Sequence, residues 1–165
     1  MNNDHDDMDP HRSQQWQDLT LAQYVEMRNG VPLGASGSLR NMLHRSLGAA
    51  SFAEFWQYWN PIWGYGLGKY VYSPMRRVLP AAIALMMTFV VSGGLHDLVI
   101  MALRRSVTFL FTPWFFILGA GVVLGRAVSM DLSNYSWQVR AGINLAYLAA
   151  GLALAVIAKR VLAIP

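Results

Sequence analysis

The chain has 165 residues, of which 55% are hydrophobic and 13% are charged, and its formal net charge is +4. So apolar a composition is unusual for a soluble domain and is typical of a small membrane protein. Cysteine is absent, which excludes disulfides and thiolate zinc sites, and no metal site is expected. The basic residues occur as scattered pairs beside apolar runs, a pattern that anchors helix ends to lipid headgroups, so we expect no nucleic-acid partner.

The N-terminal third of the sequence divides into a tail and a set of short helices. Residues 1–18 are rich in aspartate and lack apolar periodicity, which predicts a disordered acidic tail. Residues 19–50 predict short amphipathic helices joined by the flexible stretch "GASGS". The second of these helices, "SLRNMLHRSLG", has leucines on one face and basic residues nearby, as expected for a helix lying on a membrane surface.

Residues 51–78 carry helix-start signals and a high density of aromatic side chains. Ser51 and Glu54 have the spacing of a capping box, and Asn60 followed by Pro61 fits a helix N-cap with proline at the first helical position. We expect a broken, interfacial or re-entrant helix over residues 51–73, followed by a turn at Ser73-Pro74. Its tryptophan and tyrosine rings suit the boundary between water and lipid, and the predicted anchors are Trp56, Trp59, Trp63, Tyr70 and Tyr72.

The remainder, residues 79–165, predicts a three-helix transmembrane domain. Three apolar runs, at about residues 79–102, 107–128 and 141–162, each offer the roughly 20 residues needed to cross a bilayer. The expected fold is therefore an all-α integral membrane protein in which the interfacial segment precedes three transmembrane helices. Lysine and arginine counts leave the orientation open. Small residues predict close packing of the second and third helices, namely Gly119, Gly121, Gly125, Ala146, Ala150 and Gly151.

The first of these runs contains "FVVSGGLHDLVI", with two ionisable side chains at its end. Thr88, Ser92 and His96 are spaced by four residues, which places them on one stripe of a helix. Charged groups are costly inside a membrane, so Asp97 should face protein, water or the headgroups. In a purely structural interpretation, His96 bonds a neighbouring helix and Asp97 meets Arg104 or Arg105 at the interface. The other interpretation is a catalytic site.

Residues 51–100 resemble the catalytic segment of the membrane-bound O-acyltransferases, in particular the branch of wax synthases and sterol or diacylglycerol acyltransferases. The resemblance rests on a tryptophan-rich stretch that ends in Trp59-Asn60, on the "YVYSP" element at residues 70–74, and on His96-Asp97 within an apolar helix. It implies transfer of an acyl group from a thioester, typically acyl-CoA as co-substrate, to a hydroxyl acceptor, with no bound cofactor. It further implies that His96 is the general base and Asn60 orients substrate or steadies the oxyanion, while Asp97, Ser92 and Thr88 support them.

The chain differs from that family in size. Family members enclose a tunnel with eight or more spanning helices, whereas three helices cannot wall off an acyl chain. Either other membrane subunits or further copies complete the chamber, or the chain is a non-catalytic subunit that docks on a larger membrane complex. We expect a multi-pass protein of the bacterial inner membrane that contacts the bilayer and does not act alone. The two interpretations differ in whether the Thr88, Ser92 and His96 stripe faces a cavity shared with Asn60.

Overall fold

The computed structural model describes residues 18–107 and 109–161, and all regular structure within these ranges is helical. The residues expected to form the acidic tail lie almost wholly outside the described part. The helical elements are α2 (Leu21–Asn29), α3 (Ser38–Leu47), α4 (Phe52–Tyr58), α5 (Pro61–Leu67), the π-helical turn η2 (Gly68–Tyr72), α6 (Ser73–Arg76), α7 (Ala81–Arg104), α8 (Phe111–Ala127) and α9 (Trp137–Val161).

The start of α4 follows the predicted capping signal with one difference. The Ser51 hydroxyl accepts a hydrogen bond from the backbone N–H of Glu54 at 3.1 Å. The Glu54 carboxylate reaches back to the N–H of Ala50, at 2.6 Å, one residue before the position that a capping box predicts. Both bonds satisfy donors at the end of a helix, which have no partner within the helix itself.

The aromatic segment is broken at one of the two places that the sequence indicates. The chain leaves the helix at Trp59 and starts again at Pro61, with Asn60 as N-cap in the left-handed region at φ 43°. The turn expected at Ser73-Pro74 is wrong, because η2 runs directly into α6 and the helix ends only after Arg76. Pro74 therefore lies within a continuous helical run, directly after the π-helical turn.

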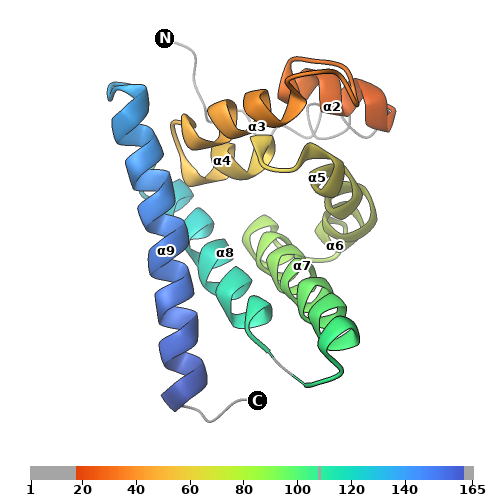
Figure 1. Ribbon diagram of the computed structural model, residues 1–165, viewed down its shortest axis with the longest axis vertical. Coiled ribbons are helices and arrows are strands. Elements are labelled where there is room, and N and C mark those ends of the chain that lie inside the picture. Colours follow the sequence, from red (N-terminus) through yellow and green to blue (C-terminus); the bar gives the residue numbers. More distant parts are fainter. Residues whose placement is uncertain (1–17, 108, 162–165) are drawn as a thin grey trace.

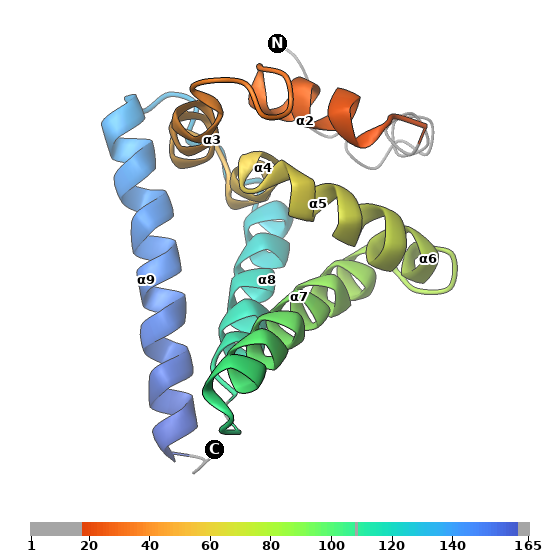
Figure 2. The ribbon, with the colours of Figure 1, turned by 45° about the vertical axis from the view of Figure 1, so that its right-hand side comes forward.

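The long helices run side by side and the short ones cross their ends. α8 packs against both α7 and α9 and runs opposite to them (Figure 1). α2, α3 and α4 lie across the end at which α9 begins, and α5 to α6 lead from there to the start of α7 (Figure 2). The core lies where α4 meets α7 and α8, around the side chains of Phe89, Phe115, Leu118 and Val122.

Two described helices, α7 with 24 residues and α9 with 25, are long and apolar enough to cross a membrane. Only 33% of the most apolar window of α7 and 22% of that of α9 are buried, whereas the core helix of a soluble protein is mostly buried. In place of the expected third span, the structure shows a shorter apolar helix, α8, with 17 residues. At 1.5 Å per residue its length is about 25 Å, which is less than the roughly 30 Å thickness of the hydrocarbon core of a bilayer.

Small residues let α8 approach its neighbours, but on more than one face. A Cβ at Gly121 would lie 2.6 Å from the Tyr147 ring, and one at Gly151 would lie 2.9 Å from Leu118, so both glycines belong to the predicted α8–α9 contact. Gly119 instead faces Phe89 on α7. Ala146, Ala150 and Gly125 do not contribute as expected, since both alanines are exposed and Gly125 faces Phe52 and Met130.

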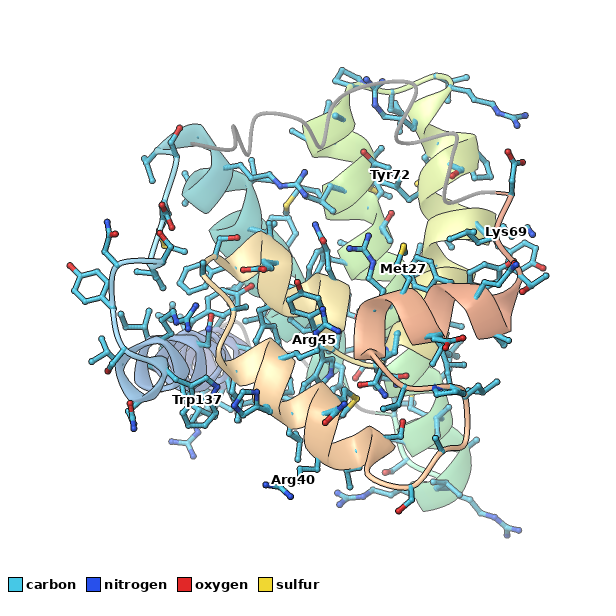
Figure 3. All side chains as sticks on the ribbon, turned by 90° about the horizontal axis from the view of Figure 1, so that it is seen from above. Met27, Arg40, Arg45, Lys69, Tyr72 and Trp137 are labelled. Atoms are coloured by element: carbon cyan, nitrogen blue, oxygen red, sulfur yellow. The ribbon has the colours of Figure 1, made fainter. Side chains whose placement is uncertain are left out.

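The start of α9 ties the spanning helices to the crossing layer. The Trp137 indole donates to the carbonyl of His44 at 3.0 Å, and the two rings stack at 5.2 Å; Figure 3 shows Trp137 beside α3. The buried amide of Asn144 donates to the carbonyls of Leu47 and Ala49. α3 is thereby fixed on the end of α9, while its Leu39 remains 65% exposed.

Candidate functional site

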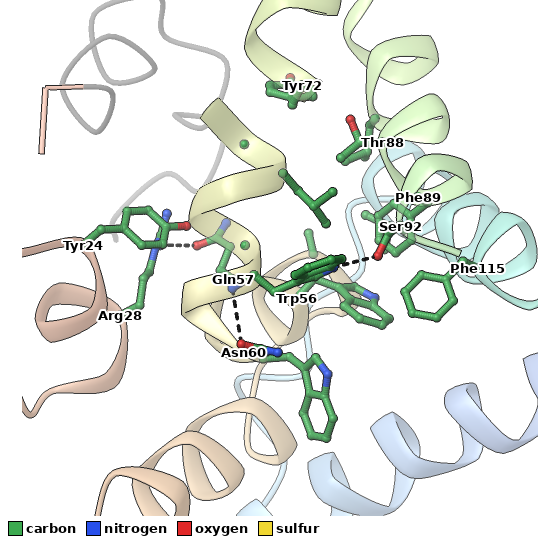
Figure 4. A pocket seen from close by; sticks show the side chains of 18 of the residues that line it. Tyr24, Arg28, Trp56, Gln57, Asn60, Tyr72, Thr88, Phe89, Ser92 and Phe115 are labelled. Carbon is green, nitrogen blue, oxygen red and sulfur yellow. Dashed lines mark hydrogen bonds between the residues drawn. The ribbon is translucent and has the colours of Figure 1, made fainter. Parts of the chain in front are cut away.

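A cavity of about 660 Å³ lies between α7 and the segment from α2 to α5 (Figure 4). Its volume falls in the range of sites for small ligands. It is lined by Leu19, Tyr24, Met27, Arg28, Ala53, Trp56, Gln57, Trp59, Asn60, Trp63, Gly64, Leu67, Gly68, Tyr72, Leu85, Thr88, Phe89, Ser92, His96, Phe115, Val122 and Arg126. The cavity therefore brings together Asn60 and the whole stripe of Thr88, Ser92 and His96.

Asn60 enters the cavity from the break between α4 and α5. Its side-chain oxygen accepts a hydrogen bond from the backbone N–H of Trp63 at 3.3 Å, as predicted for an N-cap. Asparagine is among the few residues that adopt positive φ readily, which suits the observed 43°. Because the oxygen is used in the cap, the amide nitrogen is the group that Asn60 can offer to a ligand as a donor.

Trp63 connects the two halves of the site. One turn after Asn60, its indole N–H donates to the hydroxyl of Ser92 at 3.0 Å, and its ring meets that of His96 edge-on at 5.7 Å. The contact runs from α5 to α7 across 29 residues of sequence. Trp63 thus fixes the distance between the asparagine and histidine sides of the cavity.

The His96 ring is held in one orientation by its own helix and by α8. Nδ1 lies 2.7 Å from the backbone carbonyl oxygen of Ser92. A carbonyl oxygen can only accept, so Nδ1 carries the proton and Nε2 has the free lone pair. The ring also stacks against Phe115 at 5.0 Å and Phe111 at 5.5 Å. This is the tautomer that a general base at Nε2 requires.

The two hydroxyls of the stripe are already hydrogen-bonded. Thr88 donates to the carbonyl of Ala84 at 2.7 Å, a bond within α7, and Ser92 accepts from Trp63. Both side chains are buried, at 8% and 2% exposure. Ser92 therefore contributes through its carbonyl to the orientation of His96 and through its hydroxyl to that of Trp63, while Thr88 forms part of the wall.

Asp97 does not belong to the cavity. Its fully buried carboxylate faces α8 and accepts from the backbone N–H groups of Leu110, Phe111 and Thr112, at 3.0, 2.9 and 2.8 Å, and from the Thr112 hydroxyl at 2.7 Å. The expected contact with Arg104 or Arg105 is wrong. Asp97 instead acts as an N-cap supplied by another helix, because the first N–H groups of α8 have no partner within α8.

The predicted aromatic anchors divide between the cavity and the surface. Trp56, Trp59, Trp63 and Tyr72 line the cavity, and Trp56 also donates its indole N–H to the Tyr147 hydroxyl on α9 at 3.2 Å. Tyr70 is 73% exposed, so of the five rings it is the one best placed for a membrane interface.

Several polar residues of the cavity carry no signal in the sequence. Arg28 and Tyr24 come from α2, Gln57 from α4 and Arg126 from the end of α8. Each looks like an ordinary exposed position of a short or amphipathic helix. Arg28 and Tyr24 reach the cavity because α2 folds back across α4 and α5, and Gln57 and Arg126 reach it because α4 packs against α8. Local periodicity does not encode these contacts between segments.

No protein-family model, curated protein or solved structure matches the chain. The resemblance to the membrane-bound O-acyltransferases therefore remains confined to the motifs in residues 51–100.

Proposed function

We propose that the chain is an O-acyltransferase subunit that moves an acyl group from a thioester, of the acyl-CoA type, to a hydroxyl acceptor. The observation that carries the proposal is that His96 and Asn60 line one cavity although they are 36 positions apart (96 − 60) in the sequence. A histidine used only to bond a neighbouring helix would not require this arrangement. The fixed tautomer of His96 adds support.

In the proposed reaction these two groups have separate roles. Nε2 of His96 takes the proton of the acceptor hydroxyl as its oxygen bonds to the thioester carbonyl carbon. The Asn60 amide N–H stabilises the negative charge that develops on the carbonyl oxygen. Collapse of the tetrahedral intermediate breaks the C–S bond, and the imidazolium returns the proton to the leaving thiolate.

The proposal includes a third crossing of the bilayer by α8. α7 and α9 run in the same direction (Figures 1 and 2), so if both span the membrane the connection between them must return across it. A helix of 17 residues does so when flanking residues or local thinning of the bilayer make up the difference in length. The chain is then a multi-pass protein, for which we propose the bacterial inner membrane.

Assembly with other membrane subunits, or with further copies, is part of the same proposal. The cavity is only partly enclosed, whereas acyl transfer requires a water-poor chamber. The same openness favours the second candidate function, a non-catalytic subunit that stabilises a larger membrane complex.

Substitution of His96 separates the two functions. In membranes that contain the intact complex, His96→Ala should lower acyl transfer from acyl-CoA to hydroxyl lipids by about 1,000-fold, because general-base catalysis contributes 10²–10⁴-fold. Asn60→Ala should lower it by about 100-fold, and Asn60→Asp, which keeps the cap, should lower it as well because a carboxylate repels the oxyanion.

His44→Ala is the matched control, because His44 lies outside the cavity, and it should retain activity. Membrane insertion and co-purification of partner subunits should be unchanged in all four variants. Undiminished transfer in His96→Ala, or no transfer by the unsubstituted protein with any acyl-CoA offered, would leave the scaffold subunit as the better account.

A further inference from the structure

The charged side chains around the cavity are of one sign. Among the described residues that line it, Arg28 and Arg126 are cationic and none is acidic. The acidic residues of the two helices that border it on this side, Glu26 on α2 and Glu54 on α4, do not line it. The cavity thus presents unbalanced positive charge to whatever occupies it.

Arg28 is held ready for a ligand at the α2 side of the cavity. Its Nη1 donates to the side-chain oxygen of Gln57 at 2.6 Å, and its guanidinium carbon lies 5.4 Å from the centre of the Tyr24 ring. Its Nε is shielded from solvent and has no hydrogen-bond partner among the described residues. A buried donor without a partner is costly, so the protein neighbours of Arg28 do not use the full hydrogen-bonding capacity of its guanidinium group.

Arg126 supplies the second cation from the last turn of α8. It lies one helical turn beyond Val122, which also lines the cavity, and its own side chain is exposed. The side chains of Val122 and Arg126 therefore form a strip that changes from apolar to cationic along α8. Such a strip is complementary to a molecule with a hydrocarbon tail and a negatively charged head.

The opposite wall adds apolar side chains beside the Thr88, Ser92 and His96 stripe. Leu85 and Phe89 from α7 and Phe115 from α8 line the cavity, and Figure 4 shows Phe89 and Phe115 on the side away from Arg28 and Gln57. Arginine is the side chain best suited to carboxylate and phosphate oxygens, because its planar group donates two parallel hydrogen bonds.

We propose that the cavity binds an amphiphile with an anionic head, a phosphate or carboxylate held by Arg28 and Arg126, whose tail lies against α7 and α8. The inference rests on the proposed function in taking the amphiphile to be a substrate, and it names that substrate's charge. Two sources share this chemistry, an anionic lipid of the bilayer and the phosphate-bearing thioester donor, and direct binding distinguishes them.

Binding is tested with two lipids that differ only in the phosphate. Lysophosphatidic acid and a monoacylglycerol with the same brominated chain are titrated into the intact complex in neutral detergent, and quenching of tryptophan fluorescence reports occupancy of a cavity that Trp56, Trp59 and Trp63 line. Lysophosphatidic acid should bind at least about tenfold more tightly, the difference expected for one charge-assisted hydrogen bond. Equal affinities would overturn the inference.

Arginine variants localise the effect. Arg28→Gln and Arg126→Gln should each weaken the binding of lysophosphatidic acid by about tenfold and leave the binding of the monoacylglycerol unchanged. If Arg28→Gln folds poorly, Arg28→Lys, which keeps a positive charge, should restore part of the lost affinity. Arg105→Gln, at the far end of α7, is the control and should change neither. Equal losses in Arg105→Gln would show a general attraction to anionic micelles and contradict the site.

Competition with acyl-CoA identifies the source. If acyl-CoA displaces lysophosphatidic acid in an Arg28-dependent manner, the anionic group that the cavity binds is the phosphate of the thioester donor. If both bind at the same time, the cavity binds the anionic head of a lipid. Either result supports a ligand with an anionic head. The proposed function fails separately, when arginine-dependent binding is present but no acyl transfer occurs. Transfer that persists while both lipids bind equally would refute this inference alone.

Discussion

The two faces of α7 show what a single apolar helix does with its polar residues. One face carries Thr88, Ser92 and His96 toward the cavity. The other carries Gly93, where a Cβ would lie 2.6 Å from the carbonyl oxygen of Phe111, and Asp97, which caps α8. On the first face, Nε2 of His96 remains available as a base. On the second face, both carboxylate oxygens of Asp97 accept hydrogen bonds that join α7 to α8.

His96 and Asp97 are adjacent in sequence and differ in role because successive residues of an α-helix point about 100° apart. The fully buried Asp97 is stabilised by four hydrogen-bond donors from the start of α8. His96 makes one bond to its own helix. A polar residue that is costly to place in an apolar helix therefore need not be catalytic, because its hydrogen-bond partners determine its role.

The largest effect on stability is expected at Asp97. Asp97→Ala removes the acceptor for three backbone N–H groups and one hydroxyl, and we expect a loss of about 3 kcal/mol in the free energy of unfolding, since buried donors without partners cost about 1–3 kcal/mol. The unfolding midpoint, followed by intrinsic tryptophan fluorescence in detergent, should fall by roughly 10 °C.

Graded variants test whether the cap is the cause. Thr112→Val removes only the hydroxyl donor and should lower the free energy of unfolding by about 1 kcal/mol. The loss of stability in Asp97→Asn should lie between that of Thr112→Val and that of Asp97→Ala. A wild-type midpoint in Asp97→Ala, with activity lost, would instead place Asp97 in the chemistry and erase the distinction between the two faces.

Trp63 should affect activity more than stability. Trp63→Phe keeps a ring beside His96 but loses the hydrogen bond to Ser92, so the asparagine and histidine sides are less firmly positioned. We expect kcat to fall by about tenfold, with less than about 1 kcal/mol lost in stability.

The control for Trp63→Phe is Ser92→Ala, which removes the same bond from the other side. The two kcat values should agree, and the double variant should be no worse than either single variant. Independent, multiplying effects would show that the bond between these residues does not position the site.

The smallest effect is expected at Asp131, an exposed aspartate that resembles Asp97 in its bonds. It accepts from the backbone N–H and the hydroxyl of Ser133 at 2.8 and 2.9 Å, and these bonds lower the pKa of its carboxyl below the ordinary 3.8. A carboxyl whose folded-state pKa is lowered contributes stability above its unfolded pKa, and that contribution is lost as the pH falls through the folded value.

The comparison of Asp131→Asn with the unsubstituted protein measures this contribution. The difference in unfolding midpoint should be small and constant above about pH 5, and it should shrink below about pH 4. A difference that grows as the pH falls has the wrong sign for a lowered pKa and would contradict the account of this turn.

Much of the local structure follows from the sequence because it depends on neighbouring residues. The restart at Asn60-Pro61 and the cap at Ser51 are encoded within four residues. The continued helix through Pro74 was not predicted, since proline is compatible with both a turn and a helix start. Likewise, apolar runs predict that helices form in residues 79–165 but overestimate the length of α8, whose start is set by where Asp97 caps it.

The sequence by itself determined an apolar, helical chain and a pair of chemically suitable side chains, His96 and Asn60, in separate segments. It predicted three spanning helices, whereas two of the described helices are long and apolar enough to cross a bilayer. The fold decided that these two line one cavity, that Asp97 turns away from it, and that Arg28 and Arg126 join it. The reason is physical: composition and periodicity act over a few residues, whereas the cavity is made by contacts between α2, α4, α5, α7 and α8, which only packing in three dimensions brings together.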